Sequence, residues 1–201
     1  MEELPFFNEE FIDMEMDIKS EFIITKVNSI PLANTPFIAP YVPVNLLVCE
    51  AAIKFANIQS IDTLVDLGCG DARILAMALE SIPSPKHVIG VEYDELLVAH
   101  CQAKHPAMEI IHADMFTIDL DSLNASVAIL YLLPTGLGKL STLLFKWLNT
   151  HVDRRVITIG YGIPNWIASN TLDVPMSEGG FMGGSENDLQ TIFYYTAESC
   201  K

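Results

Sequence analysis

The chain has 201 residues, of which half are hydrophobic and only 18% are charged. This is enough apolar material for one hydrophobic core, and it excludes a mostly disordered chain. The 26 acidic residues outnumber the 11 basic ones, so the formal net charge is −15. Binding to a nucleic-acid backbone needs lysine and arginine. The charge therefore argues against nucleic acid as a partner, and either favours a basic protein segment or serves solubility.

The sequence shows no targeting segment and no disulfide framework. The first 21 residues are acidic, unlike a signal peptide or a mitochondrial presequence, and no apolar run approaches the roughly 20 residues that span a bilayer. The four cysteines have no CxxC spacing, and the histidines near residue 100 lack the second half of a zinc site. We expect reduced thiols, no metal and no membrane span, in the cytoplasm or in cytoplasm and nucleus.

The chain divides into an N-terminal extension, residues 1–40, and a main domain, residues 41–201. The extension begins as an acidic arm and continues as a proline-rich strap, with four prolines between residues 29 and 44. Each proline fixes its own φ and disfavours helix in the residue before it. Residues 45–58 then predict a helix, because apolar residues recur at helical spacing and Asn45 can cap its start.

From residue 61 onward, short apolar runs alternate with helical patterns. Strands are predicted over residues 63–68, 87–93, 108–115, 125–134, 155–161 and 188–198. Helices are predicted over residues 71–82, 94–105 and 135–149, and a glycine-rich loop over 177–184. This alternation predicts an α/β fold with a doubly wound, mostly parallel seven-stranded sheet.

The stretch "VDLGCGDAR", residues 65–73, follows the first predicted strand, where doubly wound sheets bind ligands. Gly68 and Gly70 can adopt backbone angles that other residues avoid, and Cys69 between them adds little bulk. The helix that follows directs free amides toward the same place. Asp66 can orient these amides or receive a ligand ammonium. Tight turns also use glycine, so the stretch alone does not establish a binding site.

Acidic residues end the next two predicted strands. Glu92 can accept both hydroxyls of a ribose, and Asp114 can face an adenine amine. Their neighbours Tyr93 and Met115 join the predicted pocket, although Met115 is equally suited to core packing. Arg73 stands where a dinucleotide-binding motif has its third glycine, and clustered acids repel phosphates. The pattern therefore favours a cationic, phosphate-free nucleoside.

These motifs resemble class I S-adenosylmethionine-dependent methyltransferases, whose D-x-G-x-G motif is matched by residues 66–70. The resemblance covers residues 40–201 and implies that S-adenosyl-L-methionine is the cofactor. "YLLP", residues 131–134, departs from the (D/N)PP(Y/F) of enzymes that methylate DNA bases or glutamine. It resembles small protein-lysine methyltransferases related to those of the adenine nucleotide translocase and the ATP synthase c-subunit. "PYVPVNLLV" and "ITIGYGIPNW" resemble that group more loosely.

The resemblance implies methyl transfer to a lysine side chain in a basic segment of a protein. Tyr131 and Trp166 are then predicted to form an aromatic wall around the acceptor, although Tyr131 can instead pack under a neighbouring loop and Trp166 can instead anchor a surface loop. Tyr41 and Pro43 are predicted to close over the methionine part of the cofactor, or merely to cover the core. A small-metabolite methyltransferase and a catalytically inactive cofactor-binding adaptor remain alternatives.

Overall fold

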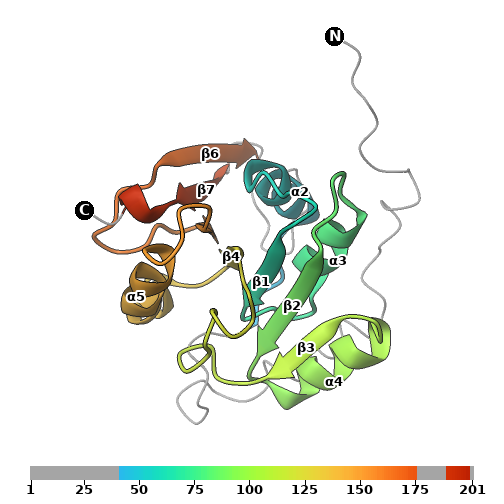
Figure 1. Cartoon of the computed structure of the whole chain (residues 1–201). Helices are drawn as coiled ribbons and strands as arrows, with labels where there is room; N and C mark the ends of the chain where they lie inside the picture. The colour runs from blue at the N-terminus through green and yellow to red at the C-terminus, as the bar shows by residue number, and fades with distance from the viewer. Residues whose placement is uncertain (1–40, 176–188, 200–201) are drawn as a thin grey trace.

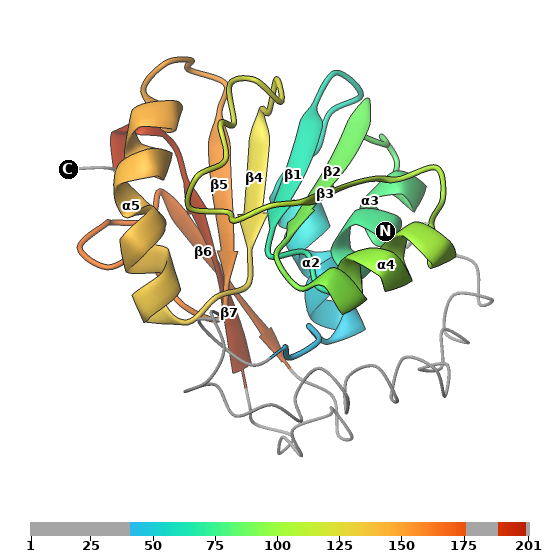
Figure 2. The same cartoon turned by 90° about the horizontal axis from the view of Figure 1, so that it is seen from below.

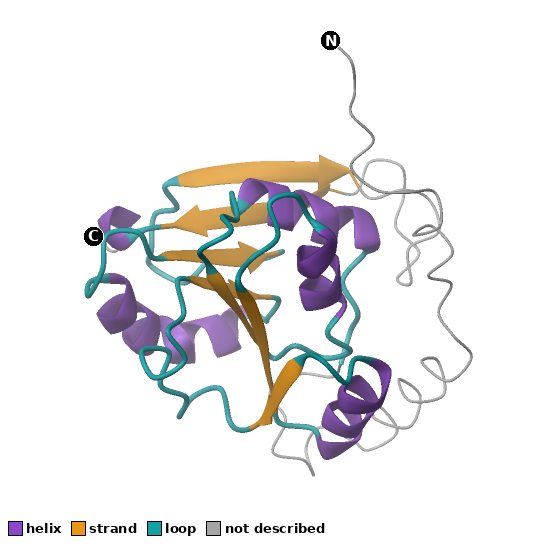
Figure 3. Cartoon of the chain, turned by 45° about the vertical axis from the view of Figure 1, so that its right-hand side comes forward, coloured by secondary structure: helices purple, strands orange, loops and turns teal. Residues whose placement is uncertain are grey.

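The computed structural model describes residues 41–175 and 189–199. The predicted extension over residues 1–40 and the predicted glycine-rich loop over 177–184 lie outside the described residues. Within them, one sheet of seven strands has the order β3-β2-β1-β4-β5-β7-β6. Figure 1 shows this sheet at the centre of the fold, and Figure 3 shows helices flanking its twisted strands. The predicted doubly wound sheet is confirmed.

The sheet is parallel except at one side. β1 pairs with β2 and β4, β2 pairs with β3, and β4 pairs with β5, all in parallel, whereas β7 is antiparallel to both β5 and β6. The strands are β1 (Thr63–Leu67), β2 (His87–Glu92), β3 (Glu109–His112), β4 (Val127–Leu130), β5 (Arg155–Ile159), β6 (Asn170–Pro175) and β7 (Leu189–Tyr195). Because β1 to β5 run the same way, their carboxyl ends meet at one edge of the sheet, called here the carboxyl edge.

Helices cover both faces of the sheet. α2, α3 and α4 lie on one face and α5 lies on the other (Figure 2). The helices are α2 (Leu46–Phe55), α3 (Arg73–Glu80), α4 (Glu95–Lys104) and α5 (Pro134–Leu148), followed at the C-terminal side by a short 3₁₀ helix, Ala197–Ser199. Asn45 caps α2 as predicted, since its side-chain oxygen accepts from the amide of Leu47 at 2.9 Å. No helix among the described residues has the length and apolar character needed to cross a membrane.

Alternation along β1 determines which face each side chain meets. All five residues of β1 are buried. Leu64 packs in the cluster formed with α2, α3 and α4, whereas Val65 and Leu67 pack in the cluster formed with α5. Successive side chains in a strand point to opposite faces. Asp66 therefore points toward the α2–α4 side of the sheet.

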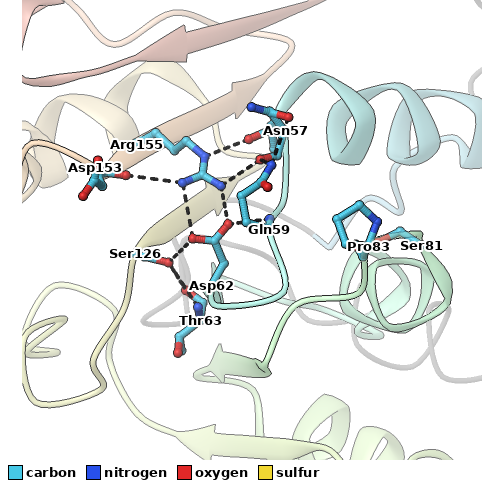
Figure 4. Close-up of polar contacts among 10 residues, drawn as sticks. Asn57, Gln59, Asp62, Thr63, Ser81, Pro83, Ser126, Asp153 and Arg155 are labelled. Carbon is cyan, nitrogen blue, oxygen red and sulfur yellow. Dashed lines mark hydrogen bonds and ion pairs between the residues drawn. The ribbon is translucent and has the colours of Figure 1, made fainter.

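A buried ion pair closes the amino edge of the sheet, opposite the carboxyl edge (Figure 4). The guanidinium of Arg155 pairs with the carboxylate of Asp62 and also donates to the carbonyl of Ala56 at 2.7 Å. The same carboxylate accepts from the amide of Gln59 at 2.7 Å and from the hydroxyl of Ser126 at 2.7 Å. Since both charged groups are buried and well hydrogen-bonded, this pair ties the starts of β1, β4 and β5 together.

Candidate functional site

The glycine turn, residues 68–72, connects β1 to α3 at the carboxyl edge. Gly68 and Gly70 have φ of +86° and +56°, and Ala72 also has a positive φ of +62°. Left-handed angles of this kind favour glycine. The amides of Gly68 and Cys69 donate to the carbonyl of Val91 at 2.8 and 3.1 Å. The turn is therefore fixed beside the end of β2, at the place the sequence predicts.

Two predicted pocket residues lie against the glycines. A Cβ on Gly68 would lie 3.5 Å from Cε of Met115 and 3.6 Å from Cδ2 of Leu132. A Cβ on Gly70 would clash with the ring of Tyr41, whose Cδ2 would lie 3.0 Å away. The ends of β3 and β4 and the segment before α2 thus converge on the turn.

Asp66 is a buried carboxylate with an unmatched oxygen. Its residue is only 2% exposed, and no described residue donates a hydrogen bond to Oδ2. Burial raises the pKa of Asp66 well above its usual value, and the negative charges of Glu92 and Asp71 raise it further. An unpaired buried charge is costly to a folded protein. A nearby cationic ligand would remove this cost.

Glu92, at the end of β2, is held against the turn. Its Oε2 accepts from the amide of Gly70 at 2.9 Å, and its Oε1 accepts from the amides of Tyr93 and Asp94 at 2.8 and 2.9 Å. Burial raises the pKa of Glu92, and these hydrogen bonds limit the rise. Tyr93 itself is partly exposed, and its carbonyl lies 3.0 Å from Nε2 of His112. Glu92 therefore joins the second strand to the glycine turn.

Asp114 lies in the turn after β3. Its Oδ1 accepts from the amide of Phe116 at 2.9 Å, and its carbonyl accepts from the amide of Thr117 at 3.0 Å. These bonds orient the carboxylate and place the next residue, Met115, against Gly68. The three predicted acids thus lie near the carboxyl ends of three adjacent strands: Asp66 is in β1, Glu92 ends β2 and Asp114 follows β3.

Cys69 contributes backbone rather than side chain to this turn. It is 6% exposed, and a Cβ on Gly90 would lie 2.7 Å from its sulfur. A hydrogen bond with Cys101 raises the pKa of the Cys69 thiol, and burial adds to this rise. Cys101 in turn donates to the carbonyl of Gly70 at 3.1 Å. The side chain of Cys69 therefore points into the core and is a neutral thiol.

An ion pair joins the start of α3 to the segment before α2. Nε of Arg73 donates to Oδ1 of Asp71 at 2.9 Å, and Nη2 lies 2.6 Å from Oδ2. Nη1 donates to the carbonyl of Val44 at 2.8 Å. Burial raises the pKa of Tyr41 strongly, and the charge of Asp71 adds to this effect. Pro43, a predicted cofactor residue, is in the same segment, which Arg73 holds against the glycine turn.

The sequence did not single out this ion pair as part of the site. Burial alone raises the pKa of Asp71, but the hydrogen bonds and charge of Arg73 outweigh burial and lower it. The signal that could have found it is an acid and an arginine two residues apart at the start of a helix whose other early residues are apolar. Such a buried charge needs a partner of opposite sign.

The predicted acceptor residue Tyr131 lies just beyond β4 on the α2–α4 side, where it packs against that core cluster. Its hydroxyl accepts a hydrogen bond from Nε2 of Gln190 in β7 at 3.2 Å. A Cβ on Gly160, at the end of β5, would lie 3.3 Å from Cε2 of Tyr131. The sequence prediction did not include Gln190, because no local pattern relates residues 59 positions apart.

Trp166 lies elsewhere. Its ring packs edge-on against Tyr195, with ring centroids 5.7 Å apart, in the core cluster on the α5 side. Tyr195 pairs with Val156, near the start of β5. The structure thus brings together Tyr41, the glycine turn, the three acids and Tyr131, and it places Trp166 on the other face of the sheet.

No metal-ligand set is present in the described part of the chain: residues 41–175 and 189–199 contain no group of three histidine, cysteine, aspartate or glutamate side chains that could hold an ion. What the site offers chemically is a buried carboxylate with one unpartnered oxygen, a carboxylate fixed on backbone amides, and a glycine turn at the carboxyl edge. These features suit a cationic ligand with hydroxyl groups.

Comparison with known proteins gives the same fold. A protein-lysine N-methyltransferase of Saccharolobus islandicus (strain REY15A) is 26% identical over 141 residues, which span 67% of this chain and 84% of that protein. An RNA methyltransferase from Salinibacter ruber, solved in complex with S-adenosyl-L-homocysteine, has a TM-score of 0.60 at 24% identity, covering 78% of this chain and 94% of that one. No protein-family model matches the chain.

A precorrin-6y C5,15-methyltransferase from Geobacter metallireducens GS-15 has a TM-score of 0.59 at 14% identity, covering 79% of this chain and 92% of that one. Both structures resemble the described residues over more than three quarters of this chain. The chain therefore has the Rossmann-like fold of class I methyltransferases.

Proposed function

We propose that this protein is an S-adenosyl-L-methionine-dependent methyltransferase that methylates a lysine side chain of another protein. The observation that carries the proposal is Asp66, a buried carboxylate whose Oδ2 has no described partner, directly beside the glycine turn. The cofactor carries a positive sulfonium and an ammonium but no phosphate. Its charge complements the acids that would repel a dinucleotide.

The residues present fit this cofactor. Asp66 would receive the ammonium of the cofactor. The glycine turn would let the cofactor lie close to the protein backbone. Glu92, already oriented by three amides, would accept the ribose hydroxyls, as its place at the end of β2 predicts. Asp114 and Met115 would face the adenine, and Tyr41 and Pro43 would cover the methionine part. When bound, the cofactor supplies a methyl group activated by a positively charged sulfur.

The acceptor side of the proposal rests on Tyr131 and on the similarity to a protein-lysine N-methyltransferase. A lysine must be neutral to react, and its ordinary pKa is about 10.4. A partly buried pocket beside an aromatic ring favours the neutral amine. In the transfer, the nitrogen lone pair forms a bond to the methyl carbon as the carbon–sulfur bond breaks. The electron pair of that bond stays on sulfur, and one proton leaves the nitrogen for water.

The enzyme chiefly has to align the amine with the methyl group, because the leaving group is already activated. The net charge of −15 favours association with a basic segment of a substrate protein. The alignment of the amine and the attraction of a basic segment both favour a lysine within a basic stretch as the methyl acceptor.

Calorimetry with S-adenosyl-L-methionine tests the cofactor. We expect the wild-type protein to bind it and the variants Asp66→Ala and Glu92→Ala to bind it more weakly. If the intact, folded protein does not bind the cofactor, the proposal is wrong.

Incubation of a cytosolic extract with methyl-labelled cofactor then tests the acceptor. Label in protein supports the proposed acceptor. Label in RNA or in small molecules would replace it with another class of substrate, and binding without any transfer would indicate an inactive adaptor. An Asp66→Ala reaction run in parallel shows which label depends on this site.

A further inference from the structure

Two further polar side chains, Tyr131 and Gln190, lie at the carboxyl edge and are joined by a hydrogen bond. Asp66 lies in β1 and Tyr131 directly follows the adjacent strand β4, and both point toward the α2–α4 side. Ile192 in β7 packs in the same cluster, so Gln190, two residues earlier, points to this side as well. Neighbouring strands are roughly 4.8 Å apart. The wall formed by Tyr131 and Gln190 therefore begins one strand from the proposed cofactor site.

Tyr131 and Gln190 meet across the strand between them because that strand ends in glycine. β5 separates β4 from β7, and Gly160 directly follows it with φ of +81°. A Cβ on Gly160 would lie 3.2 Å from Nε2 of Gln190 and 3.3 Å from the ring of Tyr131. Contacts that tight would push the two side chains apart. The missing side chain thus permits the hydrogen bond, at 3.2 Å, that spans β5.

This hydrogen bond determines what the two side chains can still offer a ligand. Gln190 donates through Nε2, and among the described residues nothing donates to its Oε1. The hydroxyl oxygen of Tyr131 accepts this one bond and has a second lone pair. Both residues are only partly buried. The pair therefore presents two uncharged hydrogen-bond acceptors within one small area.

We infer that Gln190 is a specificity-determining residue of the acceptor site, which together with Tyr131 accepts hydrogen bonds from the N–H groups of a neutral amine. The inference rests on the proposed function and extends it to β7. Uncharged oxygens hold the nitrogen in place without the strong preference for ammonium that a carboxylate has. The nitrogen lone pair then stays available to attack the methyl carbon. A methyl acceptor that reacts through oxygen or carbon and has no N–H groups would form no such hydrogen bonds with Tyr131 and Gln190.

Sinefungin tests the wall without any knowledge of the substrate. This cofactor analogue carries an amine in place of the methylated sulfonium, whereas S-adenosyl-L-homocysteine carries a bare sulfur there. We expect Gln190→Met, which keeps length and packing but removes both polar atoms, to reduce the preference for sinefungin over S-adenosyl-L-homocysteine about 3- to 10-fold in calorimetry. The affinity for S-adenosyl-L-homocysteine itself should stay within about 2-fold.

Gln190→Glu separates a specific role from a merely structural one. A carboxylate attracts a charged amine, so this variant should bind sinefungin more tightly than the wild type. It should also transfer methyl groups from S-adenosyl-L-methionine to lysine-containing peptides about 10-fold more slowly, because it holds the lysine as ammonium. A structural defect would lower the affinity for sinefungin and the rate of methyl transfer together.

Two further variants complete the design. Gln102→Met makes the same chemical change on the exposed surface of α4 and should leave every quantity unchanged. Tyr131→Phe removes the same hydrogen bond from its other side, which keeps the test valid if Gln190→Met does not fold. A sinefungin preference that neither Gln190→Met nor Tyr131→Phe alters would overturn the inference. Failure of the wild type to bind either cofactor analogue would instead overturn the proposed function.

Discussion

The substitution Asp66→Asn should weaken cofactor binding and stabilise the free protein at the same time. It removes the charge of a fully buried carboxylate whose Oδ2 has no described partner, with almost no change in volume. A hydrogen bond to a charged group contributes about 1.5–3 kcal/mol, so the Kd for S-adenosyl-L-methionine should rise about 10- to 150-fold.

The free protein should respond in the opposite direction. Burial, with the charges of Glu92 and Asp71, raises the pKa of Asp66, so the folded state binds this proton more tightly than the unfolded chain. The contribution of Asp66 to stability is therefore complete below about pH 3.9 and is lost as the pH rises through the raised pKa. At pH 7, Asp66→Asn should increase the free energy of unfolding by about 1–2 kcal/mol, which raises Tm by about 2–8 °C.

Calorimetry and thermal melting without cofactor measure the two effects. Asp62→Asn is the matched control, since Asp62 is also buried but is paired with Arg155 at the amino edge. It should lower Tm and leave the affinity for S-adenosyl-L-methionine unchanged. Undiminished cofactor binding by Asp66→Asn, or an equal loss of stability in both variants, would contradict the assigned role of Asp66.

Three further substitutions test other parts of the structure. Arg155→Met leaves Asp62 buried without its partner, and denaturant unfolding should show a loss of about 3–5 kcal/mol. Gly160→Ala forces a side chain into a left-handed backbone, and should cost about 1–3 kcal/mol in the same assay and slow methyl transfer. Arg73→Ala releases the carbonyl of Val44, so calorimetry should show weaker cofactor binding.

For each of these three substitutions, one result would contradict the prediction. An unfolding free energy unchanged in Arg155→Met would mean that the ion pair contributes nothing to stability. Equal stability and equal transfer rate in Gly160→Ala would show that the wall tolerates a side chain there. If Arg73→Ala binds cofactor like the wild type, the segment before α2 does not cover the ligand.

The lowered pKa of Asp62 gives the stability of the protein a pH dependence opposite to the one that Asp66 gives. Burial alone would raise the pKa of Asp62, but hydrogen bonds from Arg155, Ser126 and the amide of Gln59 outweigh burial and lower it. The stability that this group contributes is present above about pH 3.9 and is lost as the pH falls through the lowered pKa. Acid titration of unfolding should therefore show a destabilisation that Asp62→Asn removes. Identical acid curves for both proteins would contradict this assignment.

The sheet was predictable from the sequence because its central strands are buried on both faces. Runs such as residues 63–68 contain apolar residues almost without interruption, which is typical of parallel strands covered by helices. β6 was not located, because five of its six residues are exposed and it forms the outer strand of the sheet. Such a strand has neither an apolar run nor an alternating pattern.

The site was predictable where a motif is local. The glycine turn, Glu92 and Asp114 follow from their places at strand ends, since parallel strands bring those ends together. Arg73 binds a carbonyl 29 positions earlier, and Gln190 meets Tyr131 across another strand. Contacts between distant segments depend on strand order and side-chain direction, which no local pattern contains.

The position of Trp166 could not be predicted from a resemblance in a loop segment alone. Its place after β5 predicted a position beside Tyr131, but the ring packs on Tyr195 in the core cluster on the α5 side. A role for Trp166 at the acceptor stays a prediction, whereas Tyr131 and Gln190 form the wall that the described contacts define.

The most direct measurement is the chemical identity of the methylated product. Wild-type protein is incubated with methyl-labelled S-adenosyl-L-methionine and a protein extract, and the protein fraction is hydrolysed to amino acids and separated. Label that elutes with methylated lysine, and that Asp66→Asn reduces at least about 10-fold, is the predicted result. Label in any other amino acid, or none in the protein fraction, would contradict the proposed protein-lysine methyltransferase.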